Sequence, residues 1–67
     1  MITSLEQYQR ALGHFIAEEK DGIVQYQSLI NDLPKTPRFD RIRQALRNIA
    51  SEEKSHLATL KRLMNNP

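Results

Sequence analysis

The chain has 67 residues and no cysteine, and its ten lysines and arginines against eight aspartates and glutamates leave a net charge of +2. This length corresponds to one small domain near the lower limit for folding alone, and the absence of thiols excludes disulfides, thiolate metal sites and cysteine nucleophiles. Basic and acidic residues are interspersed, which argues against nucleic-acid binding, and no apolar run is long enough to cross a bilayer. Because the N-terminus lacks a secretory signal pattern, we expect a soluble cytoplasmic protein without membrane contact.

The first predicted element is an amphipathic helix over about residues 4–32. Thr3 with Glu6, or Ser4 with Gln7, would form a capping box at its start. A line of mostly apolar residues with seven-residue spacing then indicates a helix that packs along one side. This line consists of Leu5, Leu12, Glu19, Tyr26 and Leu33. Glu19 is its one charged member and is therefore predicted to face the core.

A short loop over residues 33–36 separates this helix from a second one. Pro34 disfavours helical geometry at Leu33, and Thr36 followed by Pro37 is typical of an N-cap with proline at the first helical position. The second helix is predicted from about residue 37 to residue 65. Two helices of similar length joined by a short loop form an antiparallel hairpin, so we expect a single all-α domain over residues 1–67.

The second helix carries two mostly apolar lines of seven-residue spacing, and one polar residue interrupts each. The two lines are Phe39, Leu46, Glu53 and Leu60, and Ile42, Ile49, His56 and Leu63. Glu53 and His56 are three residues apart, so their side chains can reach one point in space. Because a buried charge is costly unless it is paired or bound to a metal, Glu19, Glu53 and His56 are candidate metal ligands.

A two-helix hairpin cannot enclose apolar residues that occupy several lines of both helices. We therefore expect a homodimeric four-helix bundle, or a higher even-numbered oligomer. Glu19 and Glu53 both lie near mid-helix and differ in height by about one turn, at ~1.5 Å per residue. A twofold axis at that height would join four carboxylates and two imidazoles, which is the ligand set of di-iron and di-manganese carboxylate bundles.

The segment from Ile49 to His56 resembles the second ligand helix of rubrerythrins and related ferritin-like proteins. Glu18 and Glu19, followed by Tyr26, resemble the first ligand helix, in which a ligand glutamate precedes a tyrosine by seven residues. Full-length members carry two such hairpins, whereas this chain carries one. In that respect it is similar to the half-length encapsulated ferritins, which build a di-iron ferroxidase site between subunits.

This resemblance implies a ferritin-like bundle that oxidises Fe(II) with dioxygen or peroxide at a shared site. Glu19 and Glu53 would be carboxylate ligands, one terminal and one bridging, and His56 the nitrogen ligand, so these three would also be the catalytic residues. Tyr26 would donate a hydrogen bond to a ligating carboxylate. Mn or Zn could occupy the same ligands in place of iron.

The resemblance also bears on electron supply and on partners. The cysteine-ligated iron of rubrerythrins cannot form here, which favours ferroxidase activity or storage over peroxide reduction. A larger shell or compartment protein is a further candidate partner, although the C-terminal residues do not resemble a docking peptide. Three neighbouring residues, His14, Glu18 and Glu52, are candidate metal-entry residues, with a solvated surface as the alternative interpretation.

Two other functional classes stay open. A metal-free structural hairpin could use the polar residues of its seam to fix the register of a dimer, as buried polar residues do in coiled coils. A nucleic-acid or partner-binding module could use the basic residues of the second helix. These are Arg38, Arg41, Arg43, Arg47, Lys61 and Arg62.

Overall fold

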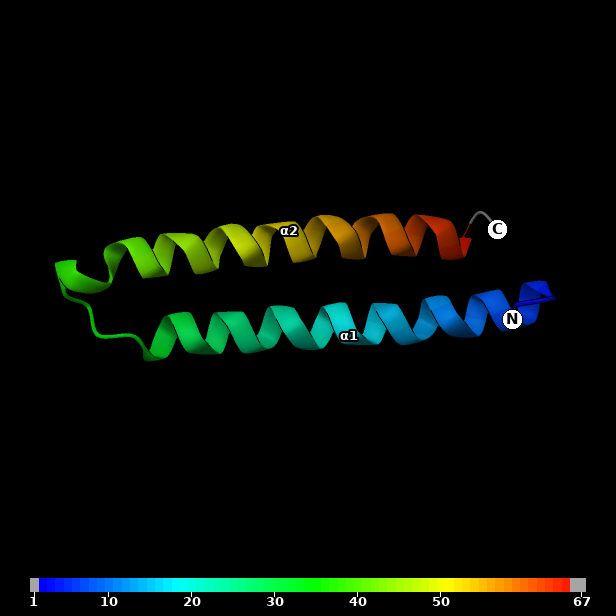
Figure 1. The fold of residues 1–67 in the computed structure, drawn as a ribbon, viewed down its shortest axis with the longest axis horizontal. Helices are drawn as coiled ribbons and strands as arrows, with labels where there is room; N and C mark the ends of the chain where they lie inside the picture. The colour runs from blue at the N-terminus through cyan, green and yellow to red at the C-terminus, as the bar shows by residue number, and fades with distance from the viewer. Residues whose placement is uncertain (1, 66–67) are drawn as a thin grey trace.

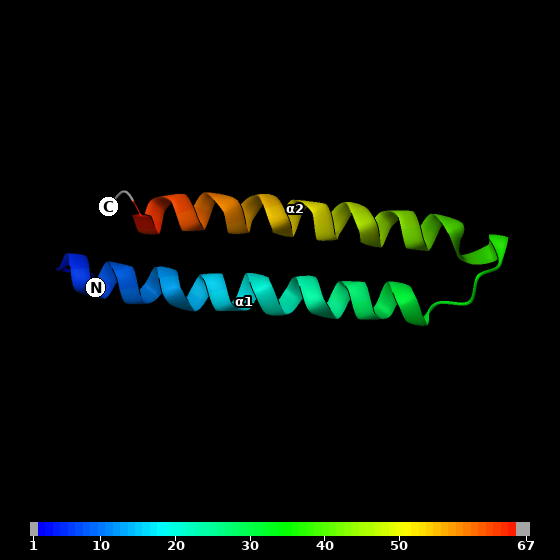
Figure 2. The same ribbon diagram turned by 180° about the vertical axis from the view of Figure 1, so that it is seen from behind.

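The computed structural model describes residues 2–65 and consists of two long antiparallel helices (Figure 1). Helix α1 spans Leu5–Asp32, the 3-10 turn η1 spans Pro37–Phe39, and α2 spans Asp40–Asn65. The all-α prediction with two helices is confirmed, and residues 2–65 contain no strand. The helices lie side by side along their whole length, with the loop at one end (Figures 1 and 2), and the molecule measures 51 × 17 × 15 Å.

The N-terminus of α1 is capped by Ser4. This residue has an extended backbone, and its hydroxyl accepts a hydrogen bond from the backbone N–H of Gln7 at 3.2 Å. The side-chain oxygen of Gln7 in turn accepts from the backbone N–H of Thr3 at 2.8 Å. The structure therefore uses the Ser4–Gln7 pair of the two predicted boxes, with the return bond one residue earlier than in the standard motif.

Pro34 ends α1 as predicted, because it holds Leu33 in an extended conformation with φ −68° and ψ 140°. The second helix begins differently. Thr36 is extended but its side chain makes no cap, and Pro37 opens a 3-10 turn instead of an α-helix. The α-helix proper therefore begins at Asp40, three residues after the predicted start.

The contact between α1 and α2 buries little. Among residues 2–65 only Leu12 and Ala50 are buried, at 6% and 5% exposure. The other residues along the contact are half-buried. The apolar members of this set are Tyr8, Ile16, Ile23, Tyr26, Ile30 and Leu33 on one side and Phe39, Leu46, Leu57, Leu60 and Met64 on the other.

One of the two lines predicted for the core side of α2 is largely left uncovered by α1. Ile42, Ile49 and Leu63 are 48%, 37% and 42% exposed, and His56 on the same line is exposed as well. A single neighbouring helix covers only a narrow stripe of α2, and this stripe lies along Leu46 and Glu53 and continues toward Ala50 and Leu57. The line with His56 is left on the open side of the hairpin. This line was predicted to be covered in a dimeric bundle, and the two helices of one hairpin do not cover it.

Several exposed apolar residues of both helices lie on this open side, which we call the carboxylate face. Phe15 and Leu29 of α1 are 50% and 47% exposed and line the same hollows as His56 and Glu53. A compact protein of 7.8 kDa would expose about 4,400 Å². This chain exposes 5297 Å². The hairpin therefore leaves apolar surface that its own two helices cannot cover. Over the part of the chain that the structure describes, neither helix has an apolar stretch long enough to span a membrane.

Arg43 ties α2 to the loop. Its Nη2 donates to the carbonyl oxygen of Pro34 at 2.7 Å, and its Nη1 donates to Asp40 Oδ1 at 3.1 Å. The Arg43 side chain is only 14% exposed, whereas that of Asp40 is 68% exposed. Because the Arg43 side chain is mostly buried, we expect its charge-assisted bond to the Pro34 carbonyl to contribute more to stability than its pair with the exposed Asp40.

We predict that Arg43→Met lowers the free energy of unfolding by about 1–3 kcal/mol, because it removes a charge-assisted hydrogen bond and leaves the Pro34 carbonyl without its donor. Urea unfolding followed by circular dichroism, at one fixed protein concentration, measures this change. Arg41→Met is the matched control, since Arg41 is exposed and forms no hydrogen bond or ion pair within residues 2–65. Equal stabilities of the two variants would contradict the role given to Arg43.

Candidate metal centre

The structure brings Glu19, Glu53 and His56 together from the middles of the two helices. His56 Nδ1 lies 3.6 Å from Glu19 Oε1, so the imidazole of α2 reaches the carboxylate of α1. Glu53 also reaches across, because a Cβ atom added to Gly22 of α1 would lie 3.4 Å from Glu53 Oε2. The three side chains that the sequence singles out as ligands are therefore neighbours within one hairpin.

The helical positions explain this arrangement. Glu19 lies on the line between Leu12 and Tyr26, and Glu53 lies on the line between Leu46 and Leu60, so both carboxylates occupy the contact between the helices. His56 is one turn beyond Glu53 and on the carboxylate face. The exposure follows the same order, since the Glu19 side chain is 21% exposed and that of His56 is 63% exposed.

One carboxylate oxygen has no partner. Glu19 Oε2 is inaccessible to solvent and forms no hydrogen bond within the described residues. A buried acceptor without a donor is unusual in folded proteins, because it loses its hydration and gains no bond in return. An unpaired anionic oxygen at the contact between two helices is a position at which a cation would be stabilised.

The carboxylate of Glu19 raises the pKa of Glu53. Hydrogen bonding to Glu19, partial burial and the negative charge of Glu19 raise the pKa of Glu53, with a further small contribution from Glu52, whereas His56 opposes the shift. Two carboxylates can hydrogen-bond to each other only when they share a proton. Glu53 therefore holds a proton more readily than an isolated glutamate does.

Two hollows open on the carboxylate face, one on each side of Glu19. The larger has a volume of about 530 Å³, and its lining residues are Glu18, Glu19, Gly22, Gln25, Tyr26, Leu29 and Glu53. The smaller has a volume of about 350 Å³ and is lined by Phe15, Glu19, His56, Thr59 and Leu60. Glu19 belongs to both and divides the space that Glu53 faces from the space that His56 faces.

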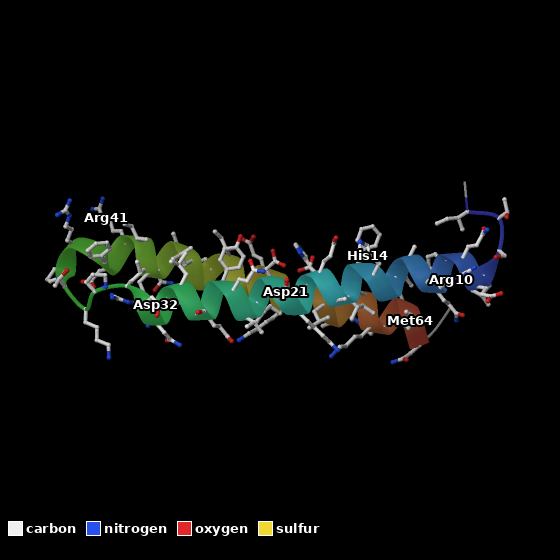
Figure 3. All side chains as sticks on the ribbon, turned by 90° about the horizontal axis from the view of Figure 1, so that it is seen from below. Arg10, His14, Asp21, Asp32, Arg41 and Met64 are labelled. Atoms are coloured by element: carbon white, nitrogen blue, oxygen red, sulfur yellow. The ribbon has the colours of Figure 1, made fainter. Side chains whose placement is uncertain are left out.

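The remaining candidate residues lie at different distances from this centre. Tyr26 is half-buried and lines the larger hollow together with both carboxylates. Glu18 lines the same hollow, and its Oε1 pairs with His14 Nε2 at 2.9 Å. His14 itself lies on the exposed surface of α1 (Figure 3). Glu52 is exposed and lines neither hollow, so it acts on the centre only through its charge.

A single hairpin does not complete a metal site. Within residues 2–65, no three or more histidine, aspartate and glutamate side chains are arranged so that one copy alone could hold a metal ion. The centre is also open, since its histidine and its apolar neighbours are exposed to solvent. One chain therefore provides two carboxylates and one imidazole on an open face that another molecule could cover.

Several residues around the centre were not anticipated from the sequence. Gln25 and Thr59 line the hollows although they lie on polar positions of their helices. Leu29 is 47% exposed and lines the larger hollow. The seven-residue spacing of Phe15, Gly22 and Leu29 is the signal that places these residues on one side of α1.

Comparison of the chain with protein-family models, with curated proteins and with solved structures found no match.

We predict that the metal-free protein loses stability as the pH rises from about 4 through the raised pKa of Glu53. The folded state holds the proton more tightly than the unfolded state, so the stabilisation is complete at acid pH and is lost on deprotonation. Glu53→Gln should remove this dependence and stabilise the protein at pH 7, because the amide is neutral at every pH. Urea midpoints between pH 4 and pH 8 in the presence of a chelator measure both effects.

Glu52→Gln is the control for this measurement. It removes the same charge from the neighbouring exposed position, which lines neither hollow. Its pH profile should keep most of the slope of the unmodified protein. A profile for Glu53→Gln that runs parallel to that of the unmodified protein would show that the two carboxylates do not share a proton.

Proposed function

We propose that two copies of this chain form a ferritin-like four-helix bundle that binds two iron ions and oxidises Fe(II). The observation that carries this proposal is the proximity of Glu19, Glu53 and His56 in the middle of the hairpin, together with the buried, unpartnered oxygen Glu19 Oε2. Carboxylates and one imidazole suit Fe(II), Fe(III) and Mn, and they also accept Zn. The residues present therefore fit a di-iron centre in their chemistry, although among residues 2–65 of one copy no three of them are arranged around a single ion.

A second copy doubles the number of candidate ligands. One hairpin offers two carboxylates and one imidazole, and two hairpins offer four carboxylates and two imidazoles, as in the di-iron carboxylate bundles. Both carboxylates lie near the middle of the hairpin, so an antiparallel or twofold-related copy would place its own set opposite them. A centre close to the loop or to the helix ends would not be completed in this way.

The surroundings of the centre support a second copy as the covering surface. Five large apolar side chains flank it on the carboxylate face and are between 37% and 50% exposed; they are Phe15, Leu29, Ile42, Ile49 and Leu63. Burial of such residues contributes about 25 cal/mol per Å² of apolar surface. A hairpin with two buried residues gains most of its stability from that burial, so folding and dimerisation are coupled.

The chemistry divides between the metal and the protein. When bound, two Fe(II) ions supply one electron each to dioxygen or peroxide. Glu19 and Glu53 would hold the cations and compensate their charge, and metal binding would compete with protonation of Glu53, whose pKa is raised. His56 adds a neutral nitrogen ligand from the open side. Tyr26 lines the same hollow, and we assign its hydroxyl as the hydrogen-bond donor to a ligating carboxylate.

A metal-free dimerisation hairpin is the second candidate function. The exposed apolar residues of the carboxylate face favour it as much as they favour the di-iron bundle, since both need a second copy. In that case Glu19, Glu53 and His56 would fix the register of the dimer and no metal would be required. The two functions differ in metal content.

Native mass spectrometry of protein purified with added Fe(II) tests the proposal, because it reports oligomer and metal count together. We expect an even-numbered oligomer with two irons for each pair of chains, and we expect Glu53→Ala to lose the iron. Glu52→Ala, at the adjacent exposed position, should keep it. A dimer that binds no metal would establish the structural hairpin instead, and a monomer would contradict both functions.

A further test uses the two glycines of α1. Gly22→Ala should raise the stability of the metal-free protein by about 0.5–1 kcal/mol through helix propensity, because the added methyl meets Glu53 Oε2 at ordinary contact distance, 3.4 Å. The methyl would occupy the hollow beside Glu53 and should weaken iron binding. Gly13→Ala is the matched control, since its methyl meets only the flexible end of Met64 at 3.9 Å. Equal iron affinity of the two variants would show that Gly22 serves helix packing alone.

A further inference from the structure

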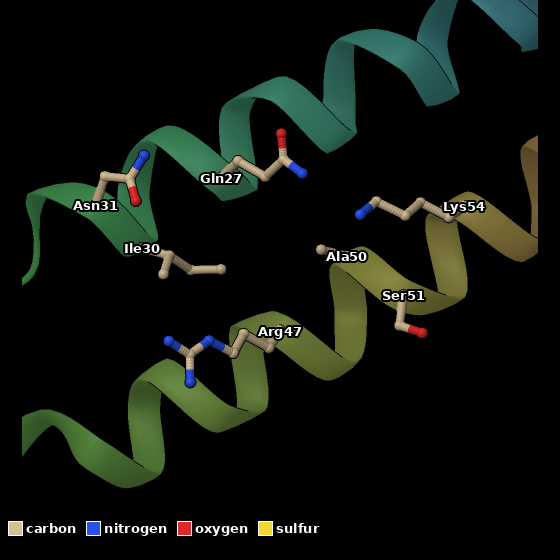
Figure 4. Close-up of a pocket in the computed structure, with 7 residues that line it drawn as sticks. All are labelled: Gln27, Ile30, Asn31, Arg47, Ala50, Ser51 and Lys54. Atoms are coloured by element: carbon tan, nitrogen blue, oxygen red, sulfur yellow. The ribbon is translucent and has the colours of Figure 1, made fainter.

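A second groove lies between the helices on the side of the contact away from the carboxylate face (Figure 4). Its volume is about 490 Å³, within the range of small-molecule sites. It shares no residue with the two hollows around Glu19. Its lining residues are Gln27, Ile30, Asn31, Arg47, Ala50, Ser51 and Lys54.

The groove carries a concentrated positive charge. Arg47 and Lys54 contribute +2 and no aspartate or glutamate lines the groove, so its charge equals the net charge of the whole chain, +2. Within residues 2–65 neither cation forms an ion pair with a carboxylate. Without Arg47 and Lys54, the chain has equal numbers of basic and acidic residues. The two groove residues therefore account for the net positive charge.

The other polar groups of the groove can all donate hydrogen bonds. Gln27 and Asn31 of α1 offer amide N–H groups, and Ser51 of α2 offers a hydroxyl. Lys54 and Gln27 extend toward one another from the two helices across the opening (Figure 4). Below them Ala50 is 5% exposed and forms part of an apolar floor with Ile30. Two cations and three neutral donors around an apolar floor match an anion that carries several oxygen acceptors.

The spacing of the two cations indicates which size of anion could contact both. Arg47 and Lys54 are seven residues apart on α2, which places them on one side of the helix and about 10 Å apart along its axis. A single phosphate ion is too small to fill the groove or to engage both side chains fully. An elongated anion with two or more oxyanion groups could contact both.

We propose that this groove binds a small polyanion whose charged groups are phosphates or carboxylates. The proposal goes beyond the di-iron function and does not depend on it, since the two sites use different residues on different sides of the hairpin. In the proposed dimer the second copy covers the carboxylate face, so the groove stays open to solvent. The shared chemistry is that of several oxyanion groups held by Arg47, Lys54 and the neighbouring amides.

A titration of the metal-free full chain with inorganic triphosphate, followed by NMR of backbone and side-chain amides, tests this proposal. Ionic strength is held constant with chloride. We expect the shifts to concentrate in residues 27–31 and 47–54, and we expect inorganic monophosphate to bind at least about tenfold more weakly because it engages fewer donors. Shifts spread over both helices, or equal binding of the two ions, would overturn the proposal. Citrate in place of triphosphate distinguishes carboxylates from phosphates as the preferred groups.

Matched variants separate a defined groove from general charge attraction. Arg47→Gln with Lys54→Gln should raise the dissociation constant of triphosphate at least about tenfold. Arg41→Gln with Lys35→Gln removes the same charge outside the groove and should change it by less than about twofold. Equal weakening by the two pairs would show that triphosphate senses only the net charge.

A second pair of variants adds a carboxylate instead of removing a cation. Ser51→Glu places a negative charge in the groove and should abolish the concentrated shifts, whereas Ser55→Glu, also exposed but outside the groove, should leave them unchanged. All these positions are exposed, so helical content by circular dichroism should stay the same in every variant. Retained triphosphate binding by Ser51→Glu would overturn the proposal.

Discussion

A two-helix hairpin has one constraint from which the rest of this structure follows: each helix has a single neighbour. Only a narrow stripe of each helix can then be covered, and in residues 2–65 this stripe buries just Leu12 and Ala50. Fixing the backbone of a helix costs about 1–2 kcal/mol per residue, which so little burial does not offset. In the proposed dimer the apolar residues of the carboxylate face would be buried, and that burial would add stability that the hairpin alone lacks.

The two carboxylates occupy part of the little surface that the helices cover. Glu19 and Glu53 occupy the middle of the covered stripe, where leucine or isoleucine would stabilise the contact more. Hydrogen bonding to Glu19, partial burial and the charge of Glu19 raise the pKa of Glu53, and Glu19 Oε2 has no hydrogen-bond partner within the described residues. Natural sequences break the rules of core packing mainly at functional sites. The cost is therefore better explained by a bound cation than by packing, and a cation would turn the least stable part of the contact into its strongest part.

The sequence predicted much of this architecture because the signals were local. Pro34 and the Ser4–Gln7 pair mark helix ends through their own backbone geometry, and seven-residue spacing identifies the side of α1 that carries Glu19. The neighbourhood of Glu19, Glu53 and His56 followed from counting residues outward from the loop. Each of these inferences needs only the pitch of a helix and the reach of a side chain.

What the sequence could not resolve is the choice between two equally apolar stripes on α2. The line with Ile42, Ile49 and Leu63 and the line with Ala50, Leu57 and Met64 both flank Glu53, and only tertiary contact decides which one faces α1. Arg43 also lies on the second line, and its side chain is mostly buried there. A search for apolar residues in the sequence does not identify a buried arginine. The same limit applies to the 3-10 turn at Pro37, where the loop geometry overrides a sequence typical of a helix start.

The two sides of the contact have opposite electrical character, and this restricts how copies of the chain can meet. The side with Glu18, Glu19 and Glu53 is acidic and flanked by apolar residues, whereas the groove beside Arg47 and Lys54 is basic and flanked by amides. Two acidic faces repel unless a cation lies between them, so a twofold dimer through the carboxylate face is strongest when metal is bound. An acidic face against a basic groove would attract without metal, but this head-to-tail contact leaves a free face at each end and does not close. Metal binding at Glu19 and Glu53 would thus select the closed dimer over the open chain of hairpins.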